Sequence, residues 1–249
     1  MKRWLPLLAT PLLPLLAALA TTPRLPIGAW ALPLVAPLTL YPAFLARVRE
    51  RDYFGAWRLG ILWTFLLSAG VIVLRLAWPH GAAVAILHGE AYRQEMFGWV
   101  ASGVAPENDW RQFLPTHLLH LGIFLLATWV SAGYLGLTMG AALVGYMSYF
   151  VGSYAAVSGH PLLGALAAWV PWSVLRVLAF ILLGAVFSRP LLVRRVWPFT
   201  RLELQLIALA ASGIVADLLI KALSAPTYGL FLRDLAHGAV VALYSCALA

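Results

Sequence analysis

Apolar stretches of about 20 residues follow one another along the chain, with short segments rich in arginine, proline or glycine between them. A helix of that length crosses the hydrocarbon core of a bilayer. The pattern therefore predicts an all-α, polytopic membrane helix bundle of eight transmembrane helices, or seven if the N-terminal segment is cleaved. The expected spans are residues 4–20, 27–45, 57–77, 113–133, 134–157, 161–188, 202–221 and 228–248.

The first apolar run, residues 1–20, allows two interpretations. Lys2 and Arg3 precede it and small residues end it at Ala20, which is also the order of features in a secretory signal. Three prolines within the run predict an irregular helix if the segment stays in the membrane. We expect a retained helix, and cleavage stays open as the alternative.

Arginines cluster in two of the connections between apolar runs, residues 46–58 and 189–201. Positively charged connections are retained on the cytoplasmic side of a membrane. With Lys2 and Arg3 also inside, eight spans place both connections and both chain ends in the cytoplasm. We therefore expect a multi-pass protein of the bacterial inner membrane.

The longest connection, residues 78–112, has an amphipathic pattern from about 82 to 104. Its apolar positions are Ile86, Tyr92, Met96, Trp99 and Val100, and its polar positions are His88, Glu90, Arg93, Gln94 and Glu95. Such a pattern predicts a helix that lies in the membrane interface, here on the outer side.

Small residues recur at a spacing of about four through residues 133–159, a stretch without a charged residue. Gly136, Gly140, Gly145 and Gly152 are its helix-packing candidates, because small side chains let helix backbones approach closely in lipid. We expect this stretch to centre a packed core over residues 113–188.

Composition excludes a soluble domain, because 63% of the residues are hydrophobic and only 10% are charged. Residues 1–249 therefore form a single integral membrane domain. The formal charge of +8 is explained by the cytoplasmic arginines, so no nucleic acid partner is expected. The single cysteine, Cys246, excludes a disulfide or a thiolate metal cluster within one chain.

Among the charged residues within the expected spans, Arg176 in the middle of the span at 161–188 and Asp217 in the span at 202–221 stand out. Counting from the shared connection at 189–201 places them at depths within about one helical turn, so they can pair. Such a pair is either a structural lock between two helices or a functional element of a transport path. The sequence leaves both alternatives open.

Histidines gather toward the expected outer face. His117 and His120 have the i, i+3 spacing of two metal ligands on one helix, and His88, Glu90 or His160 are candidates for a third. Zinc-hydrolase and serine-hydrolase signatures are both missing, so we expect no metal, no cofactor and no catalytic residue.

The order of features over residues 113–226 resembles the stage II sporulation protein M family of bacterial membrane proteins. The small-residue stretch corresponds to its helix pair, Pro171 to Arg176 stand at its Pro-His-Gly-x-x-Glu motif, and Asp217 stands at its later acidic position. Pro171 and the acidic Asp217 are retained, whereas Trp172, Ser173 and Arg176 replace the His, Gly and Glu. The resemblance implies a membrane scaffold that holds cell-envelope proteins and has no catalytic site.

The leading expectation is accordingly a bacterial inner-membrane accessory or scaffold protein. A transporter or permease subunit that uses Arg176 and Asp217 is the alternative, and a metal-dependent or glutamic-type intramembrane hydrolase is the second alternative. Expected partners are the lipid bilayer and a membrane or envelope protein, with a homo-oligomer as a further option.

Overall fold

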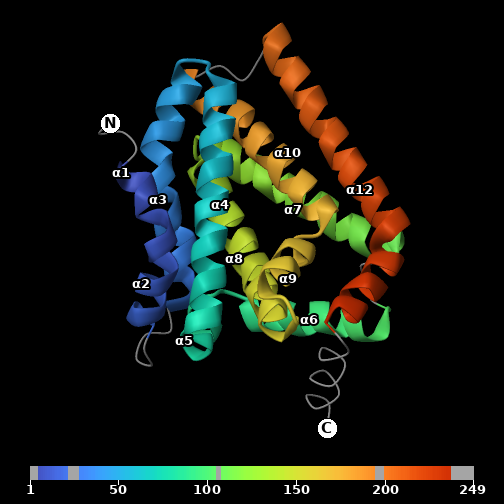
Figure 1. Cartoon of the computed structure of the whole chain (residues 1–249). Helices are drawn as coiled ribbons and strands as arrows, with labels where there is room; N and C mark the ends of the chain where they lie inside the picture. The colour runs from blue at the N-terminus through green and yellow to red at the C-terminus, as the bar shows by residue number, and fades with distance from the viewer. Residues whose placement is uncertain (1–4, 22–27, 105–107, 194–198, 237–249) are drawn as a thin grey trace.

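The computed structural model describes residues 5–21, 28–104, 108–193 and 199–236, and within these ranges all regular secondary structure is helical (Figure 1). The elements are α1 (Leu5–Leu8), η1 (Thr10–Leu12), α2 (Leu13–Ala20), α3 (Gly28–Arg49), α4 (Tyr53–Ala77), α5 (Pro79–Ala85), α6 (Gly89–Ser102), α7 (Trp110–Val130), α8 (Tyr134–Val157), α9 (Pro161–Ala168), α10 (Pro171–Phe187), α11 (Arg189–Val193) and α12 (Arg201–Leu235). The all-helical prediction is confirmed.

Six of the described helical segments are long and apolar enough to cross a membrane: α3, α4, α7, α8, α10 with α11, and α12. The protein is therefore a multi-pass membrane protein, although eight spans were predicted. At the N-terminus the described apolar segment, Pro6–Ala20, is too short and is divided into α1, η1 and α2, with a proline at the start of both η1 and α2.

The predicted division between the last two spans is wrong, because α12 continues unbroken through Pro226 for 35 residues. At about 1.5 Å per residue this helix is roughly 52 Å long, well beyond the hydrocarbon thickness. Side-chain hydroxyls of Ser224 and Thr227 donate to nearby backbone carbonyls beside the proline, as is common where a membrane helix accommodates proline. Residues 237–248 of the predicted last span lie outside the described residues.

Two other predicted helices are each divided. The span predicted at 161–188 contains two helices, α9 and α10, which are separated at Trp169 and Val170. Pro171 is the first residue of α10. The interfacial helix predicted at 82–104 is α5 and α6, because His88 takes a left-handed backbone conformation with φ of 57°. In Figure 1, α6 runs across one end of the bundle, transverse to α4 and α8.

Helix α8 lies at the centre of the bundle and packs against α3, α4, α6, α7 and α9. A Cβ at Gly152 would lie 3.0 Å from Arg75 Cβ, and one at Gly136 would lie 2.1 Å from Thr128 Oγ1. Both glycines therefore allow close helix approach. Gly145 has only ordinary contacts, and a Cβ at Gly140 would meet nothing within 4 Å. The predicted packing role of Gly140 is thus wrong, because this residue borders a cavity.

The α3–α4 connection and the start of α12 lie at one end of the bundle, opposite α5 and α6 (Figure 1). A buried carboxylate, Glu203, joins the helices there. It accepts hydrogen bonds from the hydroxyl of Tyr53 and, at 2.5 Å, from Arg189 Nη1, and it completes a capping box with Thr200 at the start of α12. This network ties the beginnings of α4, α11 and α12 together.

Candidate functional site

Arg176 of α10 and Asp217 of α12 form a two-pronged ion pair. Arg176 Nε donates to Asp217 Oδ2 at 2.8 Å, and Nη2 donates to Oδ1 at 2.9 Å. Asp217 is 1% exposed, and the side chain of Arg176 is 23% exposed. The parallel fork geometry is the strongest arrangement for an arginine and a carboxylate, and it neutralises both charges within the membrane-spanning region.

Close packing of α10 against α12 positions the pair. A Cβ at Gly213 would lie 3.4 Å from Ala179 Cβ, so the two helices approach each other closely there. Arg176 precedes Ala179 by three residues, and Asp217 follows Gly213 by four. Since residues three or four apart share one face of a helix, both charged side chains lie one turn from this contact and face each other.

A cavity of about 100 Å³ adjoins the guanidinium, between α4, α7, α8 and α10. Apolar side chains make most of its wall, and the polar groups at its edge include Arg176, Ser173, His117 and His120. Gly140 also borders it, which explains why a Cβ there would have no neighbour. The volume is sufficient for a few water molecules or one small solute.

Two buried polar atoms at this cavity, His117 Nε2 and Thr128 Oγ1, have no hydrogen-bond partner among the described residues. His117 Nδ1 lies 2.7 Å from the Phe113 carbonyl oxygen. A carbonyl only accepts, so Nδ1 carries a proton, and in the neutral form of the ring Nε2 is then an acceptor. Buried polar atoms nearly always have a protein, water or ligand partner, so this edge of the cavity is suited to a polar occupant.

Sequence reasoning missed Lys221 as a neighbour of this site. Lys221 lies one turn beyond Asp217 on α12, is 1% exposed, and places its ammonium 4.3 Å from the centre of the Phe113 ring. The sequence signal that could have indicated Lys221 was its i, i+4 spacing from Asp217, which places both side chains on one face of the helix. Thr128 was also missed, since an isolated threonine in an apolar run carries no pattern.

The histidines do not assemble the metal site that their spacing allowed as an alternative. His117 and His120 border the cavity, whereas His88 immediately precedes α6 and His160 immediately precedes α9. Glu90 is bound by Arg93 and Tyr149. Across residues 5–21, 28–104, 108–193 and 199–236, no three His, Cys, Asp or Glu side chains are grouped to hold a metal ion.

No family model, curated protein or solved structure matches this chain. The resemblance to the stage II sporulation protein M family therefore stays a prediction that rests on the layout of residues 113–226. Among the residues that carry it, Ser173 and Arg176 border the cavity and Asp217 holds the Arg176 guanidinium.

Proposed function

We propose that the protein is a membrane transporter or permease subunit that holds a small polar solute in the cavity beside Arg176. The observation that carries the proposal is the cavity itself, which combines an arginine with His117 Nε2, a buried atom that has no hydrogen-bond partner among the described residues. Ionisable side chains inside membrane spans are costly and commonly mark solute or proton paths. Here they border a space that a solute can occupy.

The broken helix beside the cavity supports the same function. Helices α9 and α10 are separated at Trp169 and Val170, and Ser173 in the first turn of α10 borders the cavity. Transporters commonly build their solute sites at such discontinuous helices, because an interrupted helix offers unpaired backbone groups and a hinge. Arg176 lies one turn further along α10, with Asp217 fixing its orientation.

The glycines explain why transport is preferred to a scaffold role. A scaffold would use the small-residue stripe to bind another membrane protein, but Gly136 packs on α7 and Gly152 packs on α4 within the same chain. Gly140 faces the cavity instead. The stripe therefore supports the internal fold and the cavity, which favours a solute path.

Access from water to the cavity tests this proposal. In a Cys246→Ser background, Gly140→Cys places a thiol in the cavity wall, and Leu219→Cys places one on the exposed apolar face of α12, where Leu219 is 57% exposed. In lipid nanodiscs, a membrane-impermeant methanethiosulfonate should modify Gly140→Cys and leave Leu219→Cys unmodified. Both thiols should react after denaturation. Equal protection of the two in nanodiscs would contradict a solute cavity.

A further inference from the structure

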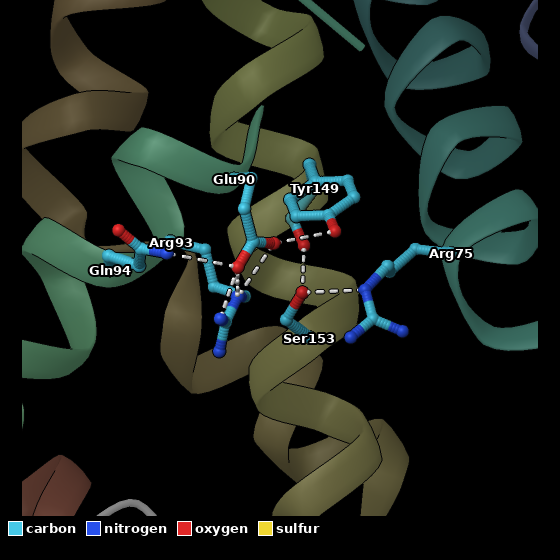
Figure 2. A network of polar contacts seen from close by, with 6 residues as sticks. All are labelled: Arg75, Glu90, Arg93, Gln94, Tyr149 and Ser153. Atoms are coloured by element: carbon cyan, nitrogen blue, oxygen red, sulfur yellow. Dashed lines mark hydrogen bonds and ion pairs between the residues drawn. The ribbon is translucent and has the colours of Figure 1, made fainter. Parts of the chain in front are cut away.

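A second polar cluster lies at the end of the bundle where α6 crosses it, and Figure 2 shows its six members. They come from three helices: Arg75 from α4, Glu90, Arg93 and Gln94 from α6, and Tyr149 and Ser153 from α8. Arg75, Glu90, Arg93, Tyr149 and Ser153 line an open pocket of about 450 Å³. This pocket is separate from the cavity beside Arg176.

The guanidinium of Arg75 is fixed in position, but most of its N–H groups have no acceptor among the described residues. Its Nε donates to Ser153 Oγ at 2.8 Å, and its Cζ lies 5.3 Å from the centre of the Tyr149 ring. Neither of its terminal nitrogens has an acceptor within the described parts of the chain. A guanidinium has five N–H donors, so four remain for a ligand, and the serine and the aromatic ring fix their direction.

Glu90 does not neutralise Arg75, because its carboxylate is already occupied. It accepts from Arg93 Nε at 3.0 Å and from the Tyr149 hydroxyl at 3.0 Å. Burial would raise the pKa of Glu90, but the hydrogen bonds from Arg93 and Tyr149 outweigh burial and lower that pKa, so the group stays ionised. The charged residues of the pocket are thus two arginines and one glutamate, a net charge of +1 with neutral histidine.

We propose that this pocket binds the phosphate group of an anionic phospholipid, with Arg75 as its principal ligand. Arginine presents parallel donors that match phosphate oxygens, and basic pockets between membrane helices bind lipid headgroups. Part of the wall is apolar, formed by Ala83, Phe97, Ala156 and Val157, which suits the acyl side of an amphiphile. The transverse α6 beside the pocket is placed as expected for a helix at headgroup depth.

The test titrates the detergent-purified protein with dioleoyl phosphatidylglycerol and measures bound lipid by native mass spectrometry. Arg75→Gln should weaken binding by about tenfold, as expected for loss of a charge-assisted contact. Arg111→Gln is the matched control, because Arg111 is an exposed arginine outside the pocket. Arg75→Lys keeps the charge without the fork and should bind with intermediate affinity. Melting temperatures without lipid establish that each variant is folded.

Two further titrations, with dioleoylglycerol and with inorganic phosphate, identify the source of the phosphate. Dioleoylglycerol, which has the same chains without phosphate, should not bind with an affinity that depends on Arg75. Inorganic phosphate should displace the phosphatidylglycerol only weakly. Equal binding by the Arg75→Gln and Arg111→Gln proteins, or Arg75-dependent binding of dioleoylglycerol, would overturn the proposal. Inorganic phosphate that binds as tightly as the lipid, with the same loss in Arg75→Gln, would overturn the lipid assignment.

Discussion

Single residues decide the chemistry of the membrane interior. Counting depth from the shared arginine-rich connection was sufficient to predict that Arg176 and Asp217 can pair, because depth depends only on helix rise. The neighbours Thr128 and Lys221 could not be found in this way. Whether they face the protein interior or the lipid depends on how each helix is rotated about its axis. Tertiary packing sets this rotation, and residue counting does not show it.

Arg176 and Asp217 should behave as one energetic unit. Arg176→Leu and Asp217→Leu should each lower the free energy of unfolding by about 3 to 5 kcal/mol, because each leaves the other charge buried and unpaired. The double variant should recover much of this loss, which unfolding measurements in detergent would detect as a strong coupling. Arg75→Leu combined with Asp217→Leu is the control and should be additive within about 0.5 kcal/mol. Additive losses for Arg176 and Asp217 would contradict their pairing.

At the scale of elements, hydrophobic length predicted the long apolar helices α3, α4, α7 and α8. It failed at residues 161–188, which are divided into α9 and α10, and at α12, which is not divided where a break was predicted. Proline was the ambiguous signal, since Pro171 begins a helix whereas Pro226 lies inside one. Proline removes one backbone donor in either case, and the surrounding packing determines whether the helix continues. Likewise, the glycine stripe of α8 was found from its spacing, but spacing did not show which glycines touch another helix.

Two glycines of α8 should respond differently to the same substitution. Gly152→Leu should lower the melting temperature, because its Cβ would lie 3.3 Å from the backbone at Ile72, which cannot move independently of α4. Overpacking of this kind costs about 1 to 3 kcal/mol. Gly140→Leu is the matched control and should be tolerated, since its side chain enters the cavity. Equal destabilisation of both variants in thermal unfolding would contradict the placement of the cavity.

The whole molecule has two distinct ends. One carries the α3–α4 connection and the Glu203 network, and the other carries α5, α6 and the Arg75 pocket. The clustering of arginines predicted that both arginine-rich connections lie on one side, and their described parts, the α3–α4 connection and Arg189 bound to Glu203 at the start of α12, lie at the same end of the bundle. Their cytoplasmic location stays a prediction, because the fold shows only that the described parts of the two connections are near each other. The side of the membrane that they face depends on how the protein is inserted.

Sided labelling of the two ends checks this orientation. In a Cys246→Ser background, Glu50→Cys in the α3–α4 connection should resist an impermeant thiol reagent applied to intact cells. Val104→Cys, at a position 78% exposed beyond α6, should react with it. Both should react once the membrane is permeabilised. Labelling of Glu50→Cys from outside would show that the orientation is opposite to the predicted one.

The proposed solute path through the cavity beside Arg176 requires that the cavity open to each side of the membrane in turn. The experiment introduces Ser173→Cys in a Cys246→Ser background and applies an impermeant thiol reagent to sealed right-side-out and inside-out vesicles. Because a transporter opens alternately to the two sides, Ser173→Cys should be labelled in both vesicle orientations, and Leu219→Cys should be unreactive in each. Protection of Ser173→Cys in one or both orientations would contradict a path across the membrane.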